Sequence, residues 1–137
     1  SRHGLTLHHP GEHRHEAIRK VHSAVVRNHD DHTKNITFLM TRDGIWHLAP
    51  AYDMAWAYKP GSKWTGQHQM SINGKRDGFS TGDFLSAAKH FDISKPQGII
   101  NTVCETALAF GDFAAEAGVP DSIAHQMQTE FRTYLKK

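Results

Sequence analysis

The chain reads NHDDHTKN at residues 28–35 and PAYD at residues 50–53, and these two stretches flank a short apolar segment. Within that segment the apolar runs ITFLM and IWHL are separated by the turn sequence Arg-Asp-Gly. The pattern predicts two antiparallel strands, over 36–40 and 45–48, joined by a tight turn. Because a hairpin brings its two ends together, residues 28–35 and Asp53 should lie close in space.

Three side chains in these stretches are of the types that phosphoryl transfer requires. Asp30 can accept the proton of an attacking hydroxyl group. Asn35, five residues later, and Asp53 offer the hard oxygen ligands that Mg²⁺ prefers when it bridges nucleotide phosphates. His32 and Lys34 lie in the same loop, and we expect them to donate hydrogen bonds to phosphate oxygens. An acid followed five residues later by asparagine is common by chance, but the hairpin and the PAYD exit make the combination specific.

The remaining sequence is mostly helical in pattern. Apolar residues at helical spacing predict a first helix over 12–28. Residues 67–72 alternate as a strand does, and Asn73-Gly74 would close it with a turn. Three more helices are expected: from the N-cap Ser80 to His90, from Lys95 to Ala117 with Gly118 as its stop, and from Pro120 with apolar residues at Ile123, Met127, Phe131 and Leu135. Residues 1–11 are predicted to be irregular and 12–137 to form one domain.

Composition excludes several classes of protein. The 137 residues carry a formal net charge of +2, which is too small to indicate nucleic-acid or membrane binding. One cysteine, Cys104, excludes an internal disulfide framework, and its apolar surroundings predict a buried thiol. No apolar run reaches the ~20 residues of a membrane span and no signal peptide is visible, so we expect a cytoplasmic protein.

Twelve histidines are an unusually large number for this length, and four of them, His8, His9, His13 and His15, crowd the N-terminal stretch. Nothing in the sequence supplies further zinc ligands, so we interpret this cluster as solvated. His22 falls on the flank of the first apolar stripe, where a histidine with satisfied hydrogen bonds is expected.

Three other residues have simpler structural interpretations. Trp46 and Trp64 are expected to be packing residues rather than a stacking platform for bases. Asp31 lacks the five-residue spacing to Asn35, so we expect it to support the site or to face solvent.

The motifs quoted above, followed by WHLAPAYDM at 46–54 and QHQMSINGK at 67–75, resemble the catalytic and metal-binding motifs of HipA-family serine/threonine kinases, toxins of bacterial toxin–antitoxin pairs. The resemblance covers residues 12–137. It implies a mainly α (α+β) fold, namely the helical C-terminal lobe of a protein-kinase-like fold with a small β-hairpin that carries the metal site. It implies that Asp30 is the catalytic acid and that Asn35 and Asp53 bind Mg²⁺, with His32 and Lys34 as nucleotide-binding positions.

The resemblance also implies ATP as the phosphoryl donor and a protein substrate of the translation machinery, such as an aminoacyl-tRNA synthetase. An antitoxin with a helix-turn-helix fold would be a partner, and DNA would be reached only through it. A glycine-rich phosphate loop and a strand lysine are not found in the sequence, and the chain does not begin with methionine. We therefore expect that the N-terminal kinase lobe is absent and that this piece alone is inactive.

Two other functions are considered. The chain could be an interaction lobe that binds an antitoxin or a separate N-terminal partner and performs no chemistry. It could also be a metal-dependent nuclease built on Asp30, His32 and the N-terminal histidines, although this leaves Asp53 and the hairpin spacing without a role.

Overall fold

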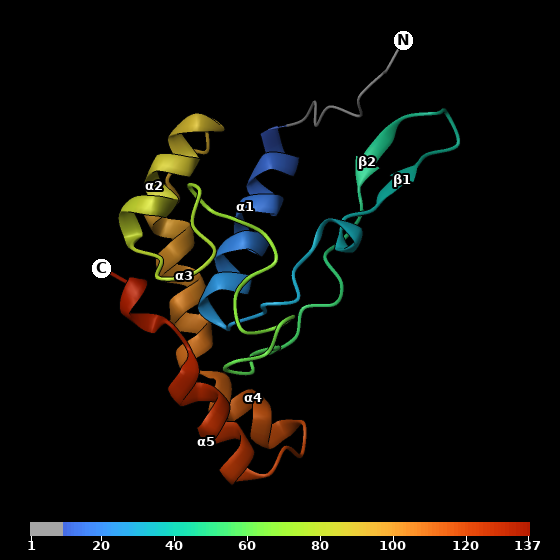
Figure 1. Cartoon of the computed structure of the whole chain (residues 1–137). Coiled ribbons are helices and arrows are strands. Elements are labelled where there is room, and N and C mark those ends of the chain that lie inside the picture. Colours follow the sequence, from blue (N-terminus) through green and yellow to red (C-terminus); the bar gives the residue numbers. More distant parts are fainter. Residues whose placement is uncertain (1–9) are drawn as a thin grey trace.

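The computed structural model describes residues 10–137, and it is mainly helical with one small antiparallel sheet, which agrees with the expected α+β class (Figure 1). In chain order its elements are α1 (Pro10–Val25), the 3₁₀ turn η1 (Thr33–Asn35), β1 (Phe38–Met40), β2 (Trp46–Leu48), α2 (Thr81–His90), α3 (Pro96–Leu108), α4 (Phe110–Glu116), α5 (Asp121–Glu130) and the 3₁₀ turn η2 (Thr133–Leu135). The irregular segment predicted over 1–11 lies largely outside the described residues. Its last two residues, Pro10 and Gly11, already belong to α1.

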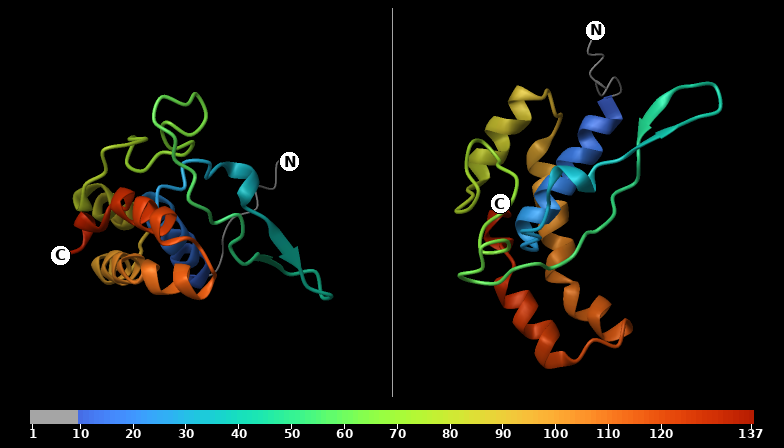
Figure 2. Two further views of the ribbon diagram at one scale, coloured as in Figure 1. Left: turned by 90° about the horizontal axis from the view of Figure 1, so that it is seen from below. Right: turned by 45° about the vertical axis from the view of Figure 1, so that its right-hand side comes forward.

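The core lies where α1 crosses α3 and where α2 and the C-terminal segment close over them (Figure 2). Ile100 of α3 is fully buried in an apolar cluster from α1, the start of α2 and the residue before its N-cap, α3 and the chain end. Its other members are Val21, Ala24, Val25, Phe79, Phe84, Ile99, Val103, Cys104, Ala107, Phe131 and Leu135. Cys104 is therefore buried, as predicted. No helix within residues 10–137 is long and apolar enough to cross a membrane.

The predicted hairpin is confirmed. Phe38 pairs with Leu48 and Met40 with Trp46 in an antiparallel register, and Gly44 in the turn has a φ of +83°, which favours glycine. The hairpin extends away from the helices, and no other layer of the described chain covers it (Figures 1 and 2). Trp46 on β2 is consequently 50% exposed, and Trp64 in the following loop is 67% exposed, so the prediction that both are packing residues is not borne out within the described chain.

The prediction of a strand over 67–72 is wrong, but the predicted turn at Asn73-Gly74 is confirmed. Asn73 and Gly74 both adopt left-handed φ values, 51° and 76°, between the bridged residues Ile72 and Lys75. Upstream of that turn the backbone amides bond elsewhere: Gln69 N donates to His29 O at 3.0 Å. Within residues 10–137 no strand lies alongside to form a ladder, and of residues 67–72 only His68 is buried.

The helix predicted over 95–117 is two helices, α3 and α4, separated at Ala109. The break directs α4 against α5, and Phe113 is left 55% exposed on the outside. Gly118, with a φ of +73°, ends α4 as predicted.

The last helix, α5, ends at Glu130, earlier than the apolar spacing suggested. Leu135 is buried through η2 rather than through a continued helix, whereas Ile123 is 48% exposed. The helix ends early because the chain after Glu130 turns toward α1, where Arg132 N donates a hydrogen bond to Val25 O at 2.8 Å.

Candidate functional site

The loop over 28–35, called here the 28–35 loop, begins where α1 ends. Arg27 takes a left-handed conformation, with a φ of 57°, and reverses the chain. Asn28 then forms a parallel bridge with Ala57, on the segment that leaves the hairpin. The loop and that exit segment therefore run side by side, which brings residues separated along the chain to one place.

Asn35 and Asp53 meet at the base of the hairpin, as the sequence predicted. Asn35 Nδ2 donates to Asp53 Oδ2 at 3.0 Å and lies 3.4 Å from the Asp30 carbonyl oxygen. Asp53 has a left-handed φ of 55°, and Asn28 Nδ2 donates to its carbonyl oxygen at 3.1 Å. Asn35 is buried and Asp53 is exposed, so the pair is open to solvent on one side.

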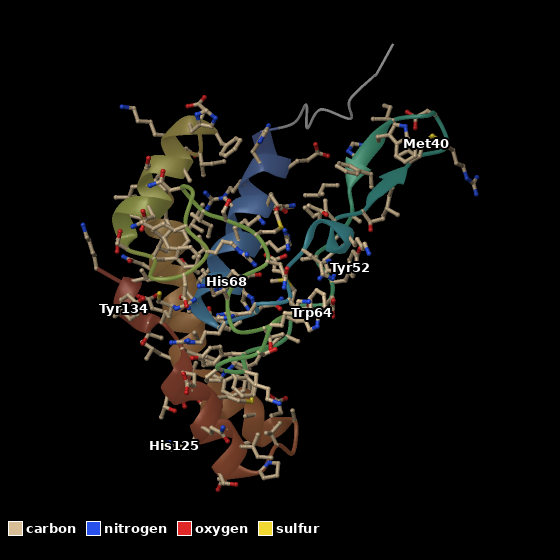
Figure 3. The ribbon with its side chains drawn as sticks, viewed as in Figure 1. Met40, Tyr52, Trp64, His68, His125 and Tyr134 are labelled. Atoms are coloured by element: carbon tan, nitrogen blue, oxygen red, sulfur yellow. The ribbon has the colours of Figure 1, made fainter. Side chains whose placement is uncertain are left out.

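Tyr52 fastens the two sides of the hairpin base. Tyr52 lies below the two strands (Figure 3). Its hydroxyl donates to Lys34 O at 2.9 Å and lies 2.6 Å from Thr37 Oγ1. These bonds join the residue before Asp53 to the chain that leads into β1. Sequence reasoning assigned no role to Tyr52, although its place in PAYD was a usable signal.

The two neighbouring acids of the loop lie in different environments. Asp30 is exposed, and Asp31 is buried against α1, where it forms an ion pair with Arg19 and lies 3.8 Å from Lys20 Nζ. Of the two alternatives expected for Asp31, exposure to solvent is therefore excluded, and its support of the site stays a prediction. Burial alone would lower the pKa of Arg19, but hydrogen bonds with Glu16 and Asp31 raise the pKa above its ordinary value. This buried pair anchors the loop to α1.

His32 and Lys34 are placed differently from each other. Lys34 is exposed in η1, so its ammonium group is free to reach a ligand. His32 is half-buried, and its Nδ1 atom has no hydrogen-bond partner among residues 10–137. Their nucleotide-binding roles stay predictions.

The histidines do not form a metal centre in the described chain. No group of three or more histidine, cysteine or acidic side chains within residues 10–137 is placed to hold a metal ion. His13 and His15 lie on α1, whereas His8 and His9 lie outside the described residues. The donors at the base of the hairpin are an amide and a carboxylate, which suit Mg²⁺ rather than zinc.

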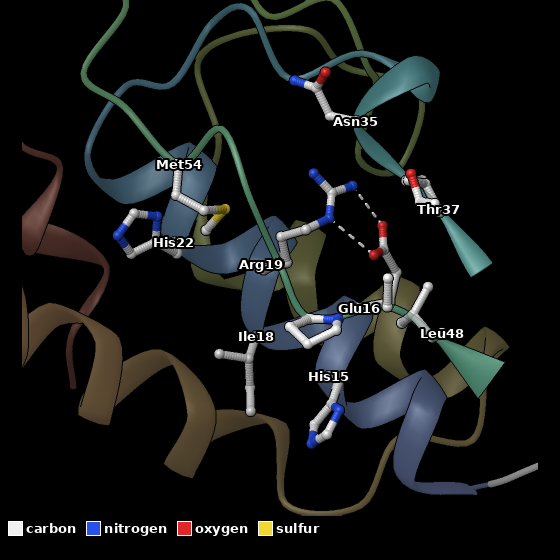
Figure 4. A pocket seen from close by; sticks show the side chains of 13 residues that line it. His15, Glu16, Ile18, Arg19, His22, Asn35, Thr37, Leu48 and Met54 are labelled. Carbon is white, nitrogen blue, oxygen red and sulfur yellow. Dashed lines mark hydrogen bonds and ion pairs between the residues drawn. The ribbon is translucent and has the colours of Figure 1, made fainter. Parts of the chain in front are cut away.

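A mostly apolar cavity of about 330 Å³ lies beside the site, between α1 and the hairpin (Figure 4). Arg19, His22, Asn35 and Met54 are among the residues that line it. Burial lowers the pKa of His22, and the charge of Asp31 opposes this only in part. The Nδ1 atom of His22 has no partner within the described residues, so the prediction of a satisfied histidine is wrong at this atom.

Fold and site together define a helical domain in which a hairpin brings the Asn35 amide and the Asp53 carboxylate together, beside the backbone carbonyl of the exposed residue Asp30. The family model described as the HipA-like C-terminal domain matches residues 5–110, and the chain belongs to this family. No curated protein and no solved structure matched the chain. The match reaches the first residue of α4, so most of α4 and all of α5 and η2 lie beyond it.

Proposed function

We propose that this chain is the catalytic C-terminal lobe of a HipA-like toxin kinase, which transfers the γ-phosphoryl group of ATP to a protein Ser/Thr hydroxyl group. The observation that carries the proposal is the 3.0 Å contact of Asn35 with Asp53, formed beside the backbone of Asp30. Membership of the HipA-like family supports it independently.

The roles follow from the donor chemistry. The Asn35 amide oxygen and the Asp53 carboxylate would hold Mg²⁺, which would supply the positive charge that phosphate groups require. Asn35 now donates to Asp53, so its amide would turn or shift to present oxygen. The exposed carboxylate of Asp30 would accept the substrate's hydroxyl proton as the new P–O bond forms and the bond to ADP breaks.

The surrounding residues would keep these groups in position. Transfer of a phosphoryl group depends mainly on positioning and charge neutralisation. Asn28 and Tyr52 fix the backbone on either side of the hairpin base, and Asp31 fixes the loop to α1 through Arg19. Lys34 and His32 would donate to phosphate oxygens.

The wider setting is proposed from the family alone. An N-terminal lobe would cover the nucleotide, the substrate would be a translation protein such as an aminoacyl-tRNA synthetase, and a helix-turn-helix antitoxin would provide the contact with DNA. We propose a cytoplasmic location and expect the lobe without its N-terminal partner to be inactive.

A second function, a lobe that only binds a partner, has one observation in its favour. The hairpin exposes Leu39, Met40, Ile45 and Trp46, each at least 50% accessible, and exposed apolar patches commonly mark interaction surfaces. ATP turnover by the chain, alone or mixed with an N-terminal lobe, would rule this function out.

The test is phosphorylation of a Ser/Thr protein substrate by the full-length protein with Mg²⁺ and ATP. Asp30→Asn should reduce the rate by about 10²-fold or more, because the proton acceptor is lost. Asp43→Asn is the matched control, since Asp43 is an exposed acid in the turn of the same hairpin. Full activity of Asp30→Asn would remove Asp30 from the proposed role.

A further inference from the structure

The C-terminal segment, beyond the residues that match the family, returns to the end of α1. Arg132 lies there and is only 3% exposed. Its backbone N donates to Val25 O at 2.8 Å, and its Nη1 donates to Ala24 O at 2.9 Å. These carbonyl groups belong to the last turn of α1, immediately before the 28–35 loop begins.

The same guanidinium group contacts His68, a buried residue near the centre of the molecule (Figure 3). Arg132 Nη1 and His68 Nε2 are 2.8 Å apart. Since a guanidinium group can only donate, His68 Nε2 must accept. The other ring nitrogen then carries the hydrogen, and the backbone of Asn28 beside it raises the pKa of His68 against the larger lowering caused by burial. One tautomer of His68 thus joins Arg132 to the 28–35 loop.

Asn28 in turn contacts Asp53, in the segment that follows the hairpin. It is 2% exposed, and its side-chain amide donates to the carbonyl oxygen of Asp53 at 3.1 Å. Its own backbone N is held by Ser23 O at 2.8 Å. A series of polar contacts therefore runs from Arg132 through His68 and Asn28 to the backbone of Asp53.

An arginine is suited to the first position of this series. Arg132 also forms an ion pair with Asp77 and lies over the ring of Phe79, 5.5 Å from its centroid. Burial lowers the pKa of Arg132 and the charge of Asp77 opposes this. The planar guanidinium group of Arg132 thus contacts the Ala24 carbonyl, the His68 imidazole and the Asp77 carboxylate at the same time. A lysine ammonium group on its flexible side chain cannot reproduce this arrangement.

We infer that Arg132 is a positioning residue that holds Asp53 in place for its metal through His68 and Asn28. The inference rests on the proposed function for its catalytic consequence, because Asp53 is there a Mg²⁺ ligand. It assigns to the segment after residue 110 a part in completing the site.

The first test needs no phosphoryl transfer. In ¹⁵N NMR spectra of the chain, Arg132→Lys should shift the Asn28 side-chain amide and the Asp53 backbone amide. His68→Leu should do the same, whereas His68→Gln should restore near-native shifts, because a glutamine amide both donates and accepts. Asn101→Ala is the control: Asn101 also holds the chain end, through Lys137 at 3.1 Å and 3.2 Å, without contacting His68.

The second test measures the Mg²⁺ concentration for half-maximal phosphorylation by the full-length protein. Loss of a residue that supports a metal ligand commonly costs about 10–100-fold in metal affinity or activity. We expect a rise within that range for Arg132→Lys and for His68→Leu, recovery with His68→Gln, and no rise with Asn101→Ala.

Several results would overturn the inference. One is unchanged Asn28 and Asp53 signals in both Arg132→Lys and His68→Leu, and another is an equal loss in Asn101→Ala. If Arg132→Lys does not fold, the comparison of His68→Leu with His68→Gln decides alone. If the NMR shifts occur as expected but the wild-type protein phosphorylates nothing, the proposed function fails while the positioning by Arg132 stands.

Discussion

The buried histidine pair His29 and His68 should make the stability of this protein strongly dependent on pH. The two rings lie 4.1 Å apart, His29 is fully buried, and His68 is 4% exposed. Burial, followed by the charge of Arg132, lowers the pKa of His29 from 6.5 to about 4. Burial, followed by the charges of His29 and Arg132, lowers the pKa of His68 to about 2.

The sign and size follow from proton linkage. Both rings stay neutral in the folded state but gain a proton in the unfolded chain below pH 6.5, the ordinary value. Their contribution is therefore complete above that pH and is lost as the pH falls toward the folded pKa of each. As the pH falls from 7 to 5, protonation of each histidine in the unfolded chain should lower the free energy of unfolding by about 2 kcal/mol, and the two together should lower it by about 4 kcal/mol.

The assay is urea unfolding followed by circular dichroism at pH 7 and pH 5. Other groups also titrate in this range, so the informative quantity is the difference between variants. His68→Gln should lose about 2 kcal/mol less than the wild type over this interval. His125→Gln, which alters an exposed histidine on α5, should behave as the wild type does. A wild-type pH dependence in His68→Gln would refute the reasoning.

Three further predictions concern stability, each measured as the free energy of urea unfolding at pH 7. Ile100→Ala should lower this free energy by about 2–5 kcal/mol, because it leaves a cavity at a fully buried position. Ile123→Ala, at a position 48% exposed, should lower it by less than 1 kcal/mol; equal losses of unfolding free energy in the two variants would contradict the core assignment. Arg19→Met should cost about 3–5 kcal/mol, since it leaves Asp31 buried without its main partner; a loss below 1 kcal/mol would mean that Asp31 finds solvent. Asp83→Ala should cost about 1–2 kcal/mol, because the Asp83 carboxylate accepts from Ser80 N at 2.8 Å at the start of α2, and an unchanged midpoint would exclude this cap.

Local sequence signals predicted the hairpin and the limits of α2 well. Arg-Asp-Gly specifies a tight turn, and Ser80 has the chemistry of an N-cap, so neither depends on distant partners. The meeting of Asn35 with Asp53 followed from the hairpin alone. These parts of the site could therefore be predicted from residues close together in the sequence.

Long-range contacts account for the errors. The early end of α5 and the return of Arg132 to α1 depend on carbonyl groups more than a hundred residues away, which no helical period reveals. The strand predicted over 67–72 failed because alternation shows which side chains are buried but not whether a partner strand lies alongside. Trp46 was misplaced because hydrophobicity does not show that a hairpin projects away from the core.

The central claim is that Asn35 and Asp53 bind a divalent metal beside Asp30. The most direct measurement is paramagnetic broadening of the ¹⁵N NMR spectrum of the chain on titration with Mn²⁺, in the presence and absence of ATP. We predict that the Asn35 side-chain amide and the Asp53 backbone amide broaden first, and that Asp53→Asn abolishes this effect. Broadening that begins instead at His13 and His15, or that persists unchanged in Asp53→Asn, would contradict the account.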